Sequence, residues 1–252
     1  MKYSFAILFI SALFFASSCK KNDNISPTAI ETDSLEKNGY KFNYVSVQSD
    51  GKTYVCRDGG GNHGSGNRQV NRKMGYIGPY GIDLDKGDPD SILFSREYTL
   101  LDSNLYIQVL FSKKLAKKDC RQELWFYYPQ NHLDLFKPGL RGFATDFDRE
   151  NSYDGIGITL DLKEGDQRVR YSTYSMEFPT LPTSITNSSQ KGSYFEITKL
   201  ATMPLGNYIE AKFKAKIFNL KEEAKTIDIG FMRLRIWAGQ PVNPLSLGKS
   251  FD

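Results

Sequence analysis

The sequence predicts an all-β protein, on the strength of its composition and of its patterning. The 252 residues include 15 Tyr, 17 Phe, 21 Gly and 10 Pro. Aromatic residues favour strands, whereas Gly and Pro favour the turns that join them. No long amphipathic helical pattern occurs, and about twelve short strand-like runs follow one another. We therefore expect an antiparallel two-sheet sandwich over residues 39–252, formed as a single domain, with a closed β-barrel as the alternative.

The domain opens with a short-range hairpin pattern. Residues 40–47 alternate as a half-buried strand does, and Asp50-Gly51 leads into a second run at 53–56. An Asp-Gly pair between two such runs predicts a β-hairpin. We expect the glycine-rich residues 57–69 that follow to form a loop between strands.

The middle of the chain predicts two strands of different kinds. Residues 105–112 alternate in the manner of a strand with one buried face. Residues 124–128 are apolar at every position, which is typical of a central strand covered on both faces, and Pro129 ends it. Residues 132–136 are expected to form a single helical turn.

The clearest hairpin is the last one. Residues 207–219 place apolar side chains on one face and charged side chains on the other, and residues 226–237 return antiparallel. In the return strand the apolar alternation changes parity at Phe231-Met232. Since a one-residue slip exchanges the two faces, we predict a β-bulge near residues 230–232.

Residues 1–18 have the features of an export signal, namely a positive charge and then an uncharged run too short to span a bilayer. The Ala16-Ser17-Ser18 sequence before Cys19 resembles a bacterial lipobox, and the residues after it are similar to lipoproteins of the Bacteroidota. The resemblance implies cleavage before Cys19 and a lipid on its sulfur, which anchors the protein to a lipid bilayer. Leu is usual where Ala16 stands, so ordinary secretion without lipid and a retained apolar anchor are the alternatives.

Residues 19–38 are polar, and we expect them to form a lipidated, disordered tether that leads to the domain. The resemblance implies a place in the cell envelope, at the outer membrane. Surface export in this group uses acidic residues directly after the cysteine. Residues 20–23, Lys-Lys-Asn-Asp, match that pattern only in part, so display toward the periplasm and toward the cell surface both stay open.

Short motifs of the domain resemble uncharacterised Bacteroidota lipoproteins. These motifs are the opening segment 47–54, the run 192–199 and the final hairpin, and the resemblance covers most of residues 40–237. It implies a β-sandwich and carries no known activity to this chain. In the final strand, residues 228–231 depart from the polar residue and glycine that are usual there.

Charge and motifs argue against several functions. The 33 Lys and Arg nearly balance 29 Asp and Glu, which does not support a nucleic-acid partner. The glycine-rich segment lacks the Gly-Lys-Ser/Thr of a P-loop, and no Gly-x-Ser-x-Gly elbow occurs. The two histidines, His63 and His132, stand in no zinc-binding spacing. No catalytic residue is therefore predicted.

The cysteines allow two readings. With Cys19 lipidated, Cys56 and Cys120 form an even pair that an oxidising compartment can join in a disulfide. Two separate buried thiols are the alternative.

Two acidic turn segments are calcium candidates, because calcium binds clustered carboxylate and carbonyl oxygens. Neither segment fits the EF-hand pattern, and solvated turn carboxylates are the alternative. We expect no other cofactor. The candidate ligands are Asp83, Asp85, Asp88, Asp146, Asp148 and Asp154.

Aromatic side chains suggest a function, because sugar rings stack on Trp and Tyr. The candidates are Trp125, Tyr127, Tyr128, Tyr153 and Trp237, with packing in the core as the alternative. We expect a membrane-anchored, non-enzymatic binding module for a glycan or another envelope protein. The alternatives are a polysaccharide-acting hydrolase, whose carboxylates the chain spacing cannot pair, and a structural or assembly lipoprotein without a small ligand.

Overall fold

The structure is a computed structural model that describes residues 43–58, 62–77, 81–85, 87–103, 105–203 and 206–236. All of them belong to one compact unit, residues 41–252. They form β-strands and short 3₁₀ helices, so the predicted all-β class is confirmed. Within these residues no helix is long and apolar enough to cross a membrane.

Most of the described strands follow one another with short connections, and the β10–β11 and β12–β13 loops are longer. Those of the first half are β1 (Asn43–Ser49), β2 (Lys52–Asp58), β3 (Asn62–Gln69), β4 (Lys73–Ile77), β5 (Gly81–Asp85), β6 (Ser91–Leu101), β7 (Leu105–Ala116), β8 (Cys120–Glu123) and β9 (Phe126–Pro129). Those of the second half are β10 (Gly139–Arg141), β11 (Gly155–Glu164), β12 (Gln167–Ser172), β13 (Tyr194–Met203), β14 (Gly206–Phe218) and β15 (Ala224–Ile236). The 3₁₀ helices are η2 (Lys117–Asp119), η3 (His132–Phe136) and η4 (Asn187–Gln190).

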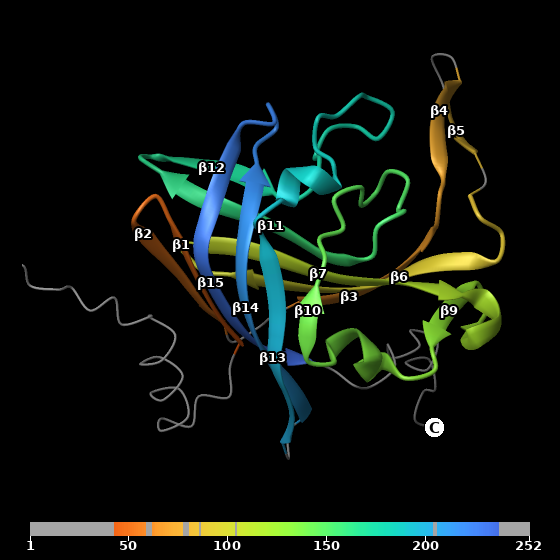
Figure 1. Cartoon of the computed structure of the whole chain (residues 1–252), viewed down its shortest axis with the longest axis horizontal. Helices are drawn as coiled ribbons and strands as arrows, with labels where there is room; N and C mark the ends of the chain where they lie inside the picture. Colours follow the sequence, from red (N-terminus) through yellow and green to blue (C-terminus); the bar gives the residue numbers. More distant parts are fainter. Residues whose placement is uncertain are drawn as a thin grey trace, which may run out of the picture. The chain divides into compact units, whose positions relative to one another are not determined.

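Eleven of these strands form one curled antiparallel sheet, while β4–β5 and β8–β9 form two separate two-stranded sheets. We call β2, β1, β15, β14, β13 and β10 the first arm, and β12, β11, β7, β6 and β3 the second arm. The arms join where Ser172 of β12 pairs with Phe218 of β14, and their strands cross steeply (Figure 1). The two-sheet sandwich and the closed barrel, as finer descriptions of this curled sheet, stay predictions.

The inner faces of both arms enclose one hydrophobic core. Ile107 of β7 and Ile158 of β11 meet Phe213 of β14 and Met232 of β15 in this core, and none of the four is exposed to solvent. The opposite face of the second arm, which we call the outer face, holds a smaller apolar cluster around Leu110. Because strand side chains alternate between faces, the remaining outer-face positions are free to be polar.

A polar clasp joins the arms at one end of the sheet. Asp50 and Gly51 have positive φ of 50° and 71° and form the predicted two-residue turn between β1 and β2. Lys225 of β15 forms an ion pair with Asp50 at 3.0 Å and another with Glu164 at the end of β11. Tyr171 of β12 donates a hydrogen bond to Glu164 at 2.9 Å. Burial and this bond raise the pKa of Tyr171 to about 12, and the bond from Lys225 lowers the pKa of Glu164.

The β14–β15 hairpin contains the predicted bulge. The register shifts between Phe213 and Ala215, so that two residues of β15 between Ile227 and Gly230 lie opposite one residue of β14. The bulge therefore exists and lies just before the predicted range. Gly230 is required beside it, because a Cβ at this position would come within 2.4 Å of the Phe213 ring.

Two predicted elements differ in the structure, and one is confirmed. Residues 124–128 are no central strand, because Leu124 and Trp125 form the turn between β8 and β9. An all-apolar run has no period that separates a covered strand from a turn. The glycine-rich residues 62–69 form β3, which pairs along β6, rather than a loop. The helical turn at 132–136 is present as η3, where Asn131 accepts a hydrogen bond from the Leu133 amide at 3.0 Å.

Candidate functional site

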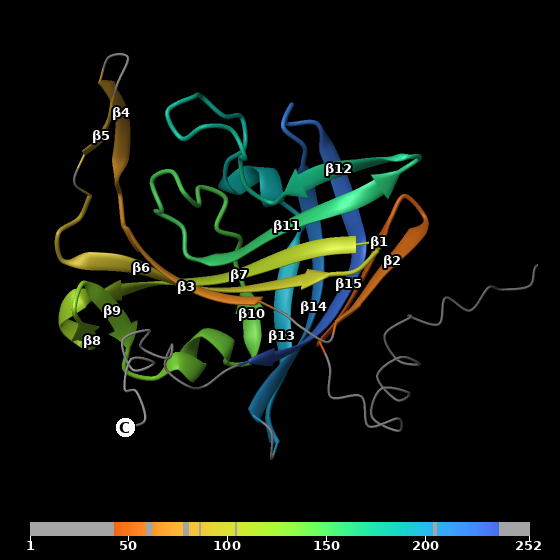
Figure 2. The ribbon, with the colours of Figure 1, turned by 180° about the vertical axis from the view of Figure 1, so that it is seen from behind.

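An open groove with a volume of about 640 Å³ lies over the outer face of the second arm. We call it the sheet groove. The β10–β11 loop and the β12–β13 loop rise above β11 in both views (Figures 1 and 2). The lining residues are Arg72, Gln108, Asp148, Thr159, Arg170, Tyr174, Ser175, Met176, Glu177, Phe178, Pro179 and Leu220.

The floor of the sheet groove is a row of outer-face polar side chains. Gln108 of β7 pairs in register with Thr159 of β11, and the hydroxyl groups of Thr159 and Tyr174 are hydrogen-bonded at 3.0 Å. Burial raises the pKa of Tyr174, so it is a neutral phenol. Arg170 of β12 donates two hydrogen bonds to the Asp161 carboxylate, at 2.7 and 3.0 Å. The floor thus offers an amide, two hydroxyls and a fixed guanidinium to a ligand.

One wall of the groove is fixed by a pair of arginines. Asp148, in the β10–β11 loop, is 2.5 Å from the Nε of Arg68. Arg72 donates hydrogen bonds to the carbonyls of Asp148, at 2.6 Å, and Arg149, at 3.0 Å. Burial lowers the pKa of the Arg72 guanidinium from its ordinary value. The wall is therefore tied to the chain just after β3.

The other wall depends on Arg149, whose guanidinium reaches across to the β12–β13 loop. It donates to the carbonyl of Leu181 at 2.7 Å, to the carbonyl of Pro179 at 3.2 Å and to Ser175 Oγ at 3.0 Å. The same loop is held from below by Glu222, which accepts a hydrogen bond from the Ser184 amide at 2.8 Å. One arginine thus sets the separation of the two loops.

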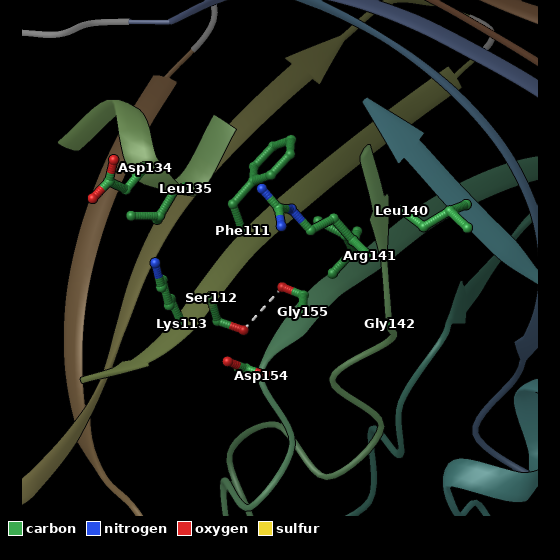
Figure 3. A pocket seen from close by; sticks show the side chains of 11 residues that line it. Phe111, Ser112, Lys113, Asp134, Leu135, Leu140, Arg141, Gly142, Asp154 and Gly155 are labelled. Carbon is green, nitrogen blue, oxygen red and sulfur yellow. Dashed lines mark hydrogen bonds between the residues drawn. The ribbon is translucent and has the colours of Figure 1, made fainter. Parts of the chain in front are cut away.

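A smaller cavity of about 230 Å³ opens between β10 and the facing ends of β7 and β11 (Figure 3). Ser112 donates a hydrogen bond to the carbonyl of Gly155 at 3.0 Å. Arg141 projects toward Phe111 in Figure 3 and donates to the carbonyl of Lys137 at 2.9 Å. These polar groups are engaged with backbone, and the volume is about a third of that of the sheet groove. The sheet groove is therefore the stronger candidate for a binding site.

The aromatic residues that the sequence predicts to stack on a sugar do not form one surface in the structure. Trp125 stands at the β8–β9 turn with 79% of its surface exposed, and Tyr153 lies in the β10–β11 loop with 42% exposed. Tyr128 is buried in the core, and Tyr127 packs against its edge. Trp237 lies outside the described residues. The sheet groove instead has Tyr174 and Phe178.

The calcium candidates are engaged with the protein itself where their side chains are described. Asp146 accepts hydrogen bonds from the amides of Ser152, at 2.7 Å, and Tyr153, at 3.1 Å, and Asp148 pairs with Arg68. Asp88 accepts from the Asp90 amide at 3.2 Å, and Asp154 accepts from the Lys114 amide at 3.4 Å. The side chains of Asp83 and Asp85 lie outside the described set. No group of three or more His, Cys, Asp or Glu within the described residues is placed to hold a metal ion.

The two domain cysteines are thiols in the structure and border the same core. Cys56 of β2 is fully buried, and Cys120 of β8 packs at the edge of that core. Burial, followed by the charge of Asp119, raises the pKa of the Cys120 thiol. Their pairing in a disulfide stays a prediction, and so does the lipid on Cys19, which lies outside the described residues.

The groove residues that sequence reasoning missed lie in or beside two loops. Tyr174 and Phe178 lie just beyond β12, which ends at Ser172. The closely spaced Pro179 and Pro182, with the residues rich in Ser, Thr and Asn at 183–189, are the sequence signals of a loop in this part of the chain. Nothing in the spacing of the chain shows that Arg149 binds this loop.

No family model, curated protein or solved structure matches the chain.

Proposed function

We propose that the protein is a non-enzymatic, membrane-anchored binding module of the cell envelope that takes a glycan in the sheet groove. The observation that carries the proposal is the composition of the groove. Its floor combines Gln108, Thr159 and Arg170, and its side presents Phe178 with 46% of its surface exposed. Planar polar groups hydrogen-bond to sugar hydroxyls, and an aromatic face stacks on the apolar face of a sugar ring.

The carboxylates of the groove favour binding over hydrolysis. Glycoside hydrolysis needs two carboxyl groups on either side of the scissile bond. Among the described residues that line the groove, the acids are Asp148 and Glu177. Asp148 forms an ion pair with Arg68, at 2.5 Å. We therefore propose a glycan ligand rather than a polysaccharide substrate, and assign no catalytic residue.

The location and the finer fold belong to the same proposal. The lipobox-like segment that ends at Cys19 and its resemblance to Bacteroidota lipoproteins support a lipid anchor in the envelope, at the outer membrane. The curled sheet, whose arms face each other across one core, supports a description as a two-sheet sandwich. Radiolabelled palmitate should enter the wild-type protein and not a Cys19→Ala variant.

A glycan array followed by calorimetry tests the ligand. We expect the protein to bind a defined set of glycans and Gln108→Ala to weaken that binding about tenfold, since a hydrogen-bond partner of the glycan is lost. The matched control is Lys212→Ala, which changes an exposed side chain of β14 on the first arm.

Three outcomes would overturn the proposal. Affinity that is equal in wild type and Gln108→Ala would place the glycan elsewhere. Release of shortened oligosaccharides from a bound polysaccharide would indicate a hydrolase. An array without any bound glycan would favour a protein partner or a structural role.

A further inference from the structure

The turn between β8 and β9 exposes three consecutive large apolar side chains. Leu124 is 69% exposed, Trp125 79% and Phe126 43%. We call these three residues the hairpin tip. Single exposed apolar residues are common on protein surfaces, whereas adjacent ones form a patch that marks an interaction site. The hairpin tip buries little in the fold, so its hydrophobicity calls for another explanation.

The backbone conformation of the hairpin tip also indicates an interaction site. Glu123 pairs with Phe126, so Leu124 and Trp125 form a two-residue turn, and Leu124 has a φ of +54°. Such turns favour Asn, Asp and Gly, because a side chain with a bulky Cβ substituent is strained at positive φ. The β1–β2 turn satisfies this preference with Asp-Gly. A strained leucine whose side chain points into solvent is an outlier that indicates function.

Basic residues lie behind the hairpin tip. Between Lys113 and Glu123 the chain carries five basic residues and two acidic ones. At about 3.3 Å per residue, Arg121, which forms an ion pair with Glu123 at 3.1 Å, lies roughly 10 Å behind Leu124. Lys117, further back, has its ammonium 5.4 Å from the centre of the Tyr127 ring. An apolar tip with cations behind it matches a bilayer interface, where phosphates lie above the acyl chains.

The position of the hairpin tip agrees with such a contact. In Figures 1 and 2 the β8–β9 hairpin lies to one side and, like the start of β1, below the loops of the sheet groove, and the ends of β13 and β14 reach lower still. The proposed lipid anchor precedes β1 in the chain. A membrane contact on the lower side therefore leaves the sheet groove facing away from the bilayer.

We propose that the hairpin tip inserts into the interface of a bilayer that contains anionic phospholipids, as a second contact beside the lipid on Cys19. Trp125 and Leu124 enter the boundary between headgroups and acyl chains, and Arg121 and Lys117 meet the phosphates. Since the anchor already holds the domain near the membrane, even a weak contact at the tip is occupied for much of the time. The contact orients the domain and is independent of what the groove binds.

Fluorescence of Trp125 tests this inference. The full-length protein has two tryptophans, so a Trp237→Phe background leaves Trp125 alone. This protein is placed in vesicles of phosphatidylcholine with and without phosphatidylglycerol, with brominated acyl chains as quencher. In the anionic vesicles we expect the Trp125 emission to move to shorter wavelength and to be quenched. Emission that stays typical of water in both kinds of vesicle would overturn the inference.

Matched variants separate the lipid contact from other causes. Neutralising the flank with Lys117→Gln, Lys118→Gln and Arg121→Gln should reduce quenching in anionic vesicles. Lys212→Gln with Lys214→Gln, which neutralises exposed residues of β14, should leave it unchanged. A spectral shift that depends on protein concentration rather than on lipid would mean that a second copy covers the tip, and would reject the bilayer as partner. Glycan binding is measured in the same preparations, so failure of one proposal is distinguishable from failure of the other.

Discussion

The β1–β2 and β8–β9 hairpins both have two-residue turns and differ in chemistry. Each has a two-residue turn whose first residue has positive φ, Asp50 at 50° and Leu124 at 54°. Asp50 takes part in the clasp with Lys225, whereas Leu124 reaches no part of the core. A two-residue turn thus serves stability in one hairpin and exposure in the other.

The strands behind the two turns explain this difference. β1 lies between β2 and β15, and its Val45 and Val47 are buried in the main core. β8 pairs only with β9, and none of its residues is fully buried. Stability should therefore depend strongly on the first arm and weakly on the hairpin tip. The following predictions test this contrast, in order of decreasing effect.

The largest loss is expected at the bulge of the first arm. Gly230→Ala places a Cβ against the fully buried ring of Phe213, and we expect the free energy of unfolding to fall by about 2–3 kcal/mol. Urea denaturation measures it. Gly142→Ala is the control, since its added Cβ would come no closer than 4.0 Å to another atom. Equal stability of Gly230→Ala and wild type would contradict the packing described for this hairpin.

A smaller loss is expected at the clasp beside the β1–β2 turn. Lys225→Met removes the cation that pairs with Glu164 and Asp50, and should cost about 1–2 kcal/mol. The hydrogen bond from Lys225 lowers the pKa of Glu164 below its ordinary 4.5. The clasp therefore stabilises fully above pH 4.5 and weakens as pH falls through the lowered pKa. Urea denaturation at several pH values should show a shallower acid loss for Lys225→Met, and an unchanged acid profile would contradict the role of Glu164.

Lowering the pH should also reduce the stability of the fold near the β8–β9 hairpin, through protonation of His132. Its ring lies 5.9 Å from those of Phe94 and Tyr128, and neither ring nitrogen has a hydrogen-bond partner among the described residues. Burial, together with the charges of Arg96 and Arg121, lowers the pKa of His132 below 6.5. The neutral ring thus favours folding fully above pH 6.5, and this contribution is lost as pH falls below that value. Thermal melts should show a melting temperature that falls with pH just below 6.5, and His132→Phe should remove this pH dependence. A pH dependence that persists in the variant would belong to another group.

The smallest effect on stability is expected at the hairpin tip itself. Leu124→Gly with Trp125→Asn places glycine at the one position of this turn with positive φ, as the geometry prefers. We expect the free energy of unfolding to stay within about 0.5 kcal/mol of wild type or to rise slightly, because the replaced side chains bury little. Partition into anionic vesicles should nevertheless decrease. A large loss of stability would show that the tip supports the fold.

The sequence was informative where residues alternate and uninformative where loops meet. The Asp50-Gly51 turn and the alternation of residues 207–219 predicted the β1–β2 and β14–β15 hairpins, because each signal is local. The run at 124–128 led to a wrong prediction, because an all-apolar run has no period that separates a covered strand from a turn. The sheet groove could not be predicted, because its walls depend on Arg149 reaching the carbonyl of Leu181, 32 positions away in the chain.

The position of β1 in the sheet has a consequence for how the chain folds. Tyr44 of β1 pairs with Arg233 of β15, so the first described strand takes its neighbour from the last one. Pairings between residues so distant in sequence form slowly, because a long loop must close before they contribute. The first arm therefore cannot be completed until synthesis has reached β15.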